Sequence, residues 1–250
     1  MWTDGLRLAV TTFTVAPISP PSRLDRAVAG WAMRFAPLVG AVLGLVLAGI
    51  LEALRWLGFP GLLAGALTVG AGALLSRGLH LDGLADTVDA LGSYRSRERA
   101  LAVMKSPEVG AFGVAALALA LLIQSAAITF VTVPGLIVAV AAGRLAAAIA
   151  CRRGVPAARP DGLGALVAGT VGWPALIVNA LAIAAVAVWA VPGRPWQGPA
   201  AVAMAIVLIL VLQRHLVRRL GGITGDVLGF LIEVASTLVL IGLCAGALPR

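Results

Sequence analysis

The sequence predicts an all-α protein, a polytopic integral membrane helix bundle with about seven transmembrane helices. Two observations predict this fold class. The mean hydropathy is +1.02 and only 12% of the residues are charged, whereas soluble globular domains carry about 25% charged residues. In addition, seven apolar segments are long enough, or nearly so, to cross a bilayer, which takes about 20 residues.

The predicted spans take up most of the chain. In order, they are 35–54, 57–76, 109–133, 136–151, 163–191, 198–213 and 227–248. The fourth is short and contains Arg144, and the fifth is longer than one crossing needs. Because little sequence remains, we expect a single membrane-embedded catalytic domain over residues 1–250. Residues 1–34 lack the apolar run and cleavage site of a signal peptide, and we expect this segment to lie at the membrane surface.

Polar and turn-forming segments separate the spans, and their charges predict the topology. The main ones are Glu52 to Arg55, 77–108, Pro134-Gly135, 152–162 and 214–226. With these boundaries, 15 of the 19 Lys and Arg residues lie on the N-terminal side of the membrane and three on the other. Cytoplasmic loops carry an excess of Lys and Arg, so we expect a cytoplasmic N-terminus. The net charge of +8 thus reflects topology, and no nucleic-acid-binding motif accompanies it.

An acidic segment follows the second span and reads Gly78-Leu79-His80-Leu81-Asp82-Gly83-Leu84-Ala85-Asp86-Thr87-Val88-Asp89. In a helix, Asp82, Asp86 and Asp89 are spaced i, i+4 and i+7 and share one face. Clustered carboxylates repel one another unless a cation lies between them, and Mg²⁺ is commonly held by a few carboxylates together with substrate phosphates. A solvated helix face and a proton or cation pathway are the alternatives.

Three further segments on the same side offer anion contacts. Lys105 precedes a helix start with glycines behind it, which suits a phosphate contact or an ordinary interfacial lysine. Arg159 lies in the loop 158–164. Arg218 precedes a Gly-rich turn that opens a helix, and Asp226 in that turn could be a metal ligand, a base or a helix cap.

Three other polar residues lie in or beside apolar segments. Arg144 and Glu233 are each about seven residues inside a predicted span; they could pair, line one polar cavity or only fix helix packing. His80 could act as a base, position substrate or be a surface histidine at a helix start. Because nearly all acids lie on one side, an enzyme with a cytoplasmic site is favoured over a transporter, which needs ionisable groups near the midplane.

The chain resembles the cobalamin synthase family, the adenosylcobinamide-GDP ribazoletransferases. The segments that carry the resemblance are 78–89, 104–113, 158–164 and 220–229, together with 34–40 in the first span. They occur in matching order over nearly the whole length. One departure is Lys105-Ser106-Pro107, where we expect many relatives to carry an acid after the lysine, whereas this chain has Ser106.

The resemblance implies a function in vitamin B12 assembly. The enzyme would transfer the adenosylcobinamide phosphoryl group from adenosylcobinamide-GDP to α-ribazole, or its 5′-phosphate, and release GMP with the help of Mg²⁺. It would be a multi-pass protein of the bacterial cytoplasmic (inner) membrane with its active site on the cytoplasmic side. Its partners would be these small molecules and membrane lipid, not nucleic acid, and a homo-oligomer is left open.

Residue chemistry then suggests roles within that reaction. We expect Mg²⁺ on Asp82, Asp86 and Asp89, and a base that is Asp226 or one of these three. Four basic residues are candidates for phosphate contacts: Lys105, Arg144, Arg159 and Arg218. His80 is a further catalytic candidate and Glu233 a further substrate contact.

Two other classes of protein remain as alternatives. CDP-alcohol phosphotransferases and prenyltransferases also present spaced aspartates at a membrane face, but Ala85 is followed by Asp86 where the CDP-alcohol pattern has arginine, and the Asn-Asp opening of the prenyltransferase pattern is missing. A cation or metabolite transporter would need a polar track to the far side, where Glu52 offers little.

Overall fold

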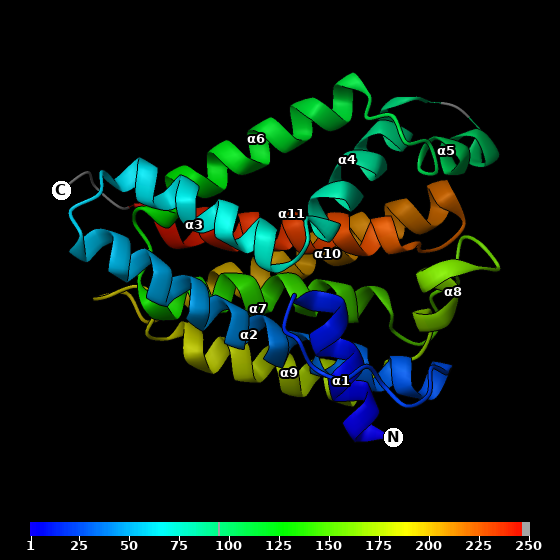
Figure 1. Cartoon of the computed structure of the whole chain (residues 1–250), viewed down its shortest axis with the longest axis horizontal. Coiled ribbons are helices and arrows are strands. Elements are labelled where there is room, and N and C mark those ends of the chain that lie inside the picture. Colours follow the sequence, from blue (N-terminus) through cyan, green and yellow to red (C-terminus); the bar gives the residue numbers. More distant parts are fainter. Residues whose placement is uncertain (95, 247–250) are drawn as a thin grey trace.

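The protein is a bundle of helices, as the composition predicts. The computed structural model describes residues 1–94 and 96–246, and these contain no strand. The helices are α1 (Trp2–Phe13), α2 (Arg26–Trp56), α3 (Gly61–Leu75), α4 (Leu79–Gly92), α5 (Arg97–Val103), α6 (Ala111–Ile128), α7 (Val133–Ala150), α8 (Gly162–Val167), α9 (Trp173–Ala187), α10 (Gln197–Leu220) and α11 (Gly225–Cys244). In Figure 1, α4, α5 and α8 lie toward the end of the bundle opposite the C-terminus.

The apolar helices correspond to the seven predicted segments, which makes this a multi-pass membrane protein. Five of them, α2, α6, α7, α10 and α11, are long and apolar enough to span a membrane by themselves. α9 is apolar but only 15 residues long. α3 reaches span length only together with α4, and the two are bent by 93°. Because α4 carries a histidine and three aspartates, we treat it as lying outside the membrane-spanning part.

Helix α7 forms the centre of the bundle and packs mainly against α2 and α11. Small residues allow this close packing. A Cβ on Gly40 of α2 would lie 2.9 Å from the carbonyl oxygen of Val140, and one on Gly44 would lie 2.8 Å from the Cα of Ile137. On the other side of α7, Gly143 lies against Ser236 of α11. The helices therefore meet nearly backbone to backbone, which leaves Arg144 as a large polar side chain in a tightly packed centre.

The N-terminal segment differs in part from the prediction. Helix α1 packs against α2, and its Asp4 accepts hydrogen bonds from the backbone N–H and the hydroxyl of Ser22, both at 2.9 Å. Asp25 caps α2 by accepting from the N–H of Val28. Residues 26–34, expected at the membrane surface, are therefore the first turns of the long helix α2. Arg95 and Arg250, which enter the charge count, and the end of the seventh predicted span lie outside the described residues.

Candidate active site

A sharp bend brings the acidic helix over the end of the bundle. Arg77 and Gly78, between α3 and α4, both have positive φ, at 59° and 66°. This left-handed conformation is uncommon for a residue other than glycine, and it ends α3 abruptly. The chain turns by 93°, and α4 then packs against α11 and α6.

Two glycines let α4 cross α11 at very short range. A Cβ on Gly83 would lie 2.5 Å from the carbonyl oxygen of Asp226, and one on Gly229 would lie 3.1 Å from the Cα of His80. At Gly83 a side chain would force the helices apart, and at Gly229 it would fit only with a small shift of its neighbours. The acidic residues on both sides of Gly83 therefore lie beside the first turn of α11.

Asp82, Asp86 and Asp226 form an acidic cluster at this crossing. The pKa of Asp86 is raised from 3.8 to about 6, first by burial and then by the negative charges of Asp82, Asp226 and Asp89. The positive charge of Arg159 offsets part of this effect. Burial disfavours the charged form of a carboxyl group, and repulsion between neighbouring carboxylates adds to that effect. The structure thus brings together acids that lie more than 130 residues apart in the sequence.

Two loops predicted from glycine and proline content form the wall of a cleft beside the acids. The backbone N–H of Ala158 donates to the carbonyl of Ile223 at 2.9 Å, and the N–H of Ile223 donates to the carbonyl of Pro156 at 3.0 Å. The cleft has a volume of about 310 Å³. Its polar lining includes His80, Arg159, Asp161, Thr224 and Asp226.

The segment around α5 closes the rim of the cleft. Arg159 donates to the carbonyl of Leu101, and Arg97 donates to the carbonyl of Ala158 at 3.2 Å. The Nζ of Lys105 lies 3.9 Å from a carboxylate oxygen of Asp161, with both side chains well exposed. Arg218 is different: it is exposed in the last turn of α10 and does not line the cleft.

Asp89 has a structural contact that sequence spacing did not predict. Its two carboxylate oxygens accept hydrogen bonds from the N–H groups of Gly110, at 2.7 Å, and Gly113, at 2.9 Å. These groups lie at the start of α6, where backbone N–H groups have no partner within the helix. Asp89 therefore caps α6, a contact that its i+7 position did not indicate, and its role as a metal ligand stays a prediction.

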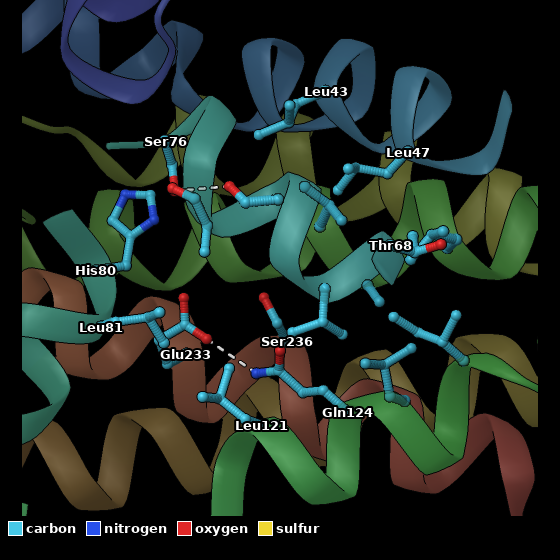
Figure 2. Close-up of a pocket in the computed structure, with 18 of the residues that line it drawn as sticks. Leu43, Leu47, Thr68, Ser76, His80, Leu81, Leu121, Gln124, Glu233 and Ser236 are labelled. Carbon is cyan, nitrogen blue, oxygen red and sulfur yellow. Dashed lines mark hydrogen bonds between the residues drawn. The ribbon is translucent and has the colours of Figure 1, made fainter. Parts of the chain in front are cut away.

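Arg144 and Glu233 lie in a second, inner chamber rather than in the cleft. The chamber lies between α2, α3, α4, α6, α7 and α11, and Figure 2 shows Ser76, His80, Gln124, Glu233 and Ser236 along its walls. No ion pair joins Arg144 to Glu233 among the described residues. Of the earlier alternatives, the structure therefore supports a shared polar cavity.

Two further chamber residues correct or extend the sequence analysis. His80 is only 3% exposed, so it is not a surface histidine, and it lines both the chamber and the cleft. Gln124 donates to Glu233 at 2.8 Å and to Thr237 at 2.9 Å. Sequence reasoning missed Gln124, although a glutamine inside an apolar span was a signal that could have found it.

Comparison with known proteins assigns the chain to a family. The profile described as cobalamin-5-phosphate synthase matches residues 5–244. The chain belongs to this family. Similar proteins named adenosylcobinamide-GDP ribazoletransferase occur in Frankia casuarinae, at 42% identity over 94% of this chain and 92% of the relative, and in Nocardioides sp., at 42% identity over 97% and 99%. A relative of the same name in Corynebacterium efficiens is 38% identical over 98% and 92%.

Membership of the cobalamin-5-phosphate synthase family confirms the resemblance drawn from the sequence. No solved structure matches the chain, so the site must be interpreted from its own geometry. Three of the segments that carried the resemblance, 78–89, 158–164 and 220–229, line or flank the cleft. The fourth, 104–113, reaches it through Lys105 and holds Asp89 through the start of α6.

The acidic cluster fits Mg²⁺ only if the substrate supplies ligands as well. Within the described part of the chain, no three His, Cys, Asp or Glu side chains lie close enough together to hold a metal ion by themselves. Mg²⁺ is usually bound through one or two carboxylates, water and substrate phosphates rather than in an all-protein cage. The pKa of Asp86 is raised first by burial and then by the negative charges of Asp82, Asp226 and Asp89, and a bound cation would offset the repulsion between these charges.

Proposed function

We propose that this chain transfers the adenosylcobinamide phosphoryl group from adenosylcobinamide-GDP to α-ribazole, or to its 5′-phosphate, and releases GMP. The observation that carries the proposal is that Asp226, Arg159 and a Gly-rich helix start line one cleft at one end of a membrane bundle. Asp82 and Asp86 do not line this cleft, but the charges of both Asp82 and Asp226 act on Asp86 beside it. Phosphoryl transfer depends mainly on positioning and on neutralising charge, and this cleft offers residues for both tasks.

Phosphate binding is the first task of the cleft. Arg159 lines it, and Lys105 at the rim is held near Asp161. The 20-residue helix α11 begins at the cleft, with Thr224 as its N-cap. Backbone N–H groups at a helix N-terminus attract anions. We assign the diphosphate of the substrate to the space between Arg159 and this helix start.

Asp82 and Asp86 are the carboxylates that we assign to Mg²⁺. When bound, the ion would neutralise charge on the diphosphate. This assignment leaves out Asp89, whose carboxylate caps α6.

We assign to Asp226 the role of accepting the proton of the attacking ribose hydroxyl. The ribose hydroxyl oxygen forms a bond to the phosphorus that bears adenosylcobinamide, and the bond from that phosphorus to the GMP oxygen breaks. The hydroxyl proton passes to the Asp226 carboxylate as general base. Asp226 is suited to this because it lines the cleft and lies against α4 at Gly83.

The location of the cleft in the cell is also a proposal. The positive-inside rule places the end of the bundle that carries α4, α5 and α8 in the cytoplasm, and the membrane would be the bacterial inner membrane. Cysteine substitutions at Arg218, at the cleft end, and at Trp56, at the far end of α2, would test this. We expect a membrane-impermeant thiol reagent added to intact cells to label the variant at Trp56 above the level set by the native Cys151 and Cys244, and the variant at Arg218 only at that level.

The function itself is tested with purified protein in lipid nanodiscs. GMP release is measured with adenosylcobinamide-GDP alone, and then with α-ribazole or its 5′-phosphate added. We expect release only when both substrates are present, with equal formation of the cobalamin product. GMP release without the ribazole substrate would instead indicate a hydrolase. Turnover of CDP-alcohols or prenyl diphosphates would support the alternative transferases.

A further inference from the structure

The inner chamber has a mixed lining that is unusual for the centre of a membrane bundle. Its volume is about 70 Å³. Aliphatic side chains form one part of the wall, among them Leu43, Leu47, Leu136 and Val140. The other part is formed by polar side chains of His80, Gln124, Arg144, Glu233 and Ser236. A site with apolar walls and a few convergent polar groups is typical of small-molecule binding.

Three polar atoms of this wall have no hydrogen-bond partner in the described structure: Nε of Arg144, Nε2 of His80 and Oγ of Ser236. Arg144 and His80 are 6% and 3% exposed. The Nη2 of Arg144 lies 3.5 Å from Nδ1 of His80. Because a guanidinium can only donate, Nδ1 is the acceptor and the imidazole proton lies on Nε2. The wall therefore carries three unused donors, and burial without a partner is costly for each.

The chamber lies next to the cleft, with His80 as a shared wall. On α11, Glu233 of the chamber lies seven residues after Asp226 of the cleft, which is about 10 Å along a helix. That distance is of the order of the length of a nucleoside. A ribose beside Asp226 would therefore place its base at the chamber.

We propose that the inner chamber binds the aromatic base of the ribazole substrate, an inference that rests on the proposed function. This base is a dimethylbenzimidazole, with flat apolar faces and one ring nitrogen that accepts a hydrogen bond. The aliphatic walls match the faces, and one of the unused donors of Arg144, His80 and Ser236 can donate a hydrogen bond to the nitrogen. Guanine is assigned outside the chamber, because it is joined to the diphosphate that we place between Arg159 and the start of α11.

Size requires that His80 move when the base binds. The chamber, at about 70 Å³, has about half the volume of a cavity that admits benzene. His80 is held on the cleft side by the ring of Phe13, with the ring centroids 5.9 Å apart. Rotation of His80 would join the chamber to the cleft of about 310 Å³ and make room for a bicyclic base.

The test replaces one alanine of the chamber wall by leucine, which narrows the chamber. Ala73 of α3 lines the chamber, whereas Ala66 of the same helix is exposed. We expect Ala73→Leu to raise KM for α-ribazole at least tenfold and to leave KM for adenosylcobinamide-GDP within twofold, while Ala66→Leu changes neither. An unchanged KM for α-ribazole in folded Ala73→Leu, or an equal rise for both substrates, would overturn the proposal.

A binding measurement separates this proposal from the proposed function. Free dimethylbenzimidazole is applied to the protein in equilibrium dialysis, which needs no turnover. We expect binding to the unmodified protein that weakens at least tenfold in Ala73→Leu and severalfold in Ser236→Ala, which removes a donor without adding bulk. Absence of GMP release from the unmodified protein would contradict the proposed function. Absence of base binding, or binding that neither substitution affects, would contradict the proposal that the inner chamber binds the base.

Discussion

Gly83 on α4 and Gly229 on α11 meet backbone to backbone, and a Cβ added to Gly229 would lie 3.3 Å from the Cα of Gly83. This contact sets the distance between the acidic face of α4 and Asp226. The carboxylates of the cluster come from two helices that no local sequence signal connects, so the glycine pair is what makes the cluster. The first prediction tests this contact.

Gly83→Ala should separate α4 from α11. Its Cβ would lie 2.5 Å from the Asp226 carbonyl oxygen, so the helices must move apart and the acids with them. We expect kcat to fall at least tenfold, because a small displacement of positioned groups is enough for such a loss. Gly70→Ala on α3 is the matched control, since a Cβ there meets nothing within 4 Å. Equal kcat values for the two variants would contradict this reading.

Asp86→Asn should stabilise the fold in the absence of divalent cations. The pKa of Asp86 is raised from 3.8 to about 6, so between these values the folded state binds more protons than the unfolded state. Stability therefore falls as pH rises from 3.8 to about 6, and the asparagine variant escapes this loss. We expect the Tm of Asp86→Asn to exceed that of the unmodified protein at about pH 7.5 and to approach it at about pH 4.

Mg²⁺ should raise the Tm of the unmodified protein more than it raises the Tm of Asp86→Asn. We expect added Mg²⁺ to raise the Tm of the unmodified protein, because a ligand that binds the folded state stabilises it. The effect should be much smaller for Asp86→Asn. If Mg²⁺ raises both Tm values equally, Asp86 is not part of the metal site.

Asp89→Ala should lower the stability of the fold and leave the affinity for Mg²⁺ nearly unchanged. The N–H groups of Gly110 and Gly113 lose their acceptor, and an unsatisfied buried donor costs about 1–3 kcal/mol. Asp89→Asn keeps one acceptor oxygen and should lose about half as much stability. Thermal unfolding and the Mg²⁺ concentration for half-maximal activity are the two measurements. A stable Asp89→Asn that needs tenfold more Mg²⁺ would restore Asp89 as a metal ligand.

Arg159→Gln should weaken binding of adenosylcobinamide-GDP. Arg159 lines the cleft, whereas Arg218 is exposed outside it, so Arg218→Gln is a control with the same charge change. We expect KM for adenosylcobinamide-GDP to rise about tenfold in Arg159→Gln, since a charge-assisted hydrogen bond contributes on the order of 1.5–3 kcal/mol. Arg218→Gln should remain within twofold. A larger rise in this KM for Arg218→Gln than for Arg159→Gln would instead indicate a phosphate site at the end of α10.

Local sequence patterns predicted much of this molecule. Hydropathy located the apolar helices, and the spacing of Asp82 and Asp86 on α4 needed only helical periodicity. The glycines around Asp226 indicated a tight turn before α11, which the structure contains. These features depend on neighbours within about two helical turns, and the sequence shows such neighbours directly.

Contacts between residues far apart in the chain could not be predicted from the sequence. Asp89 fits the i+7 position of the acidic face, but its capping of α6 depends on where Gly110 lies in space. Gly78 indicates that a helix could end between α3 and α4, but nothing in the sequence predicts the left-handed Arg77 or the bend of 93°. Arg144 and Glu233 line one chamber, which was one of the predicted alternatives, but only the packing of α6 reveals that Gln124 donates to Glu233 and Thr237.

The central claim is that the carboxylates of α4 bind Mg²⁺ for the release of GMP, and the most direct measurement is the Mg²⁺ dependence of that release in Asp82→Asn. Glu52→Gln, in an exposed ion pair with Arg55 outside the cleft, is the control. The account predicts that the rate of Asp82→Asn falls by at least a hundredfold at any Mg²⁺ concentration, with its Tm retained, while Glu52→Gln keeps the unmodified Mg²⁺ dependence. Near-normal release by folded Asp82→Asn with an unchanged Mg²⁺ dependence would contradict it.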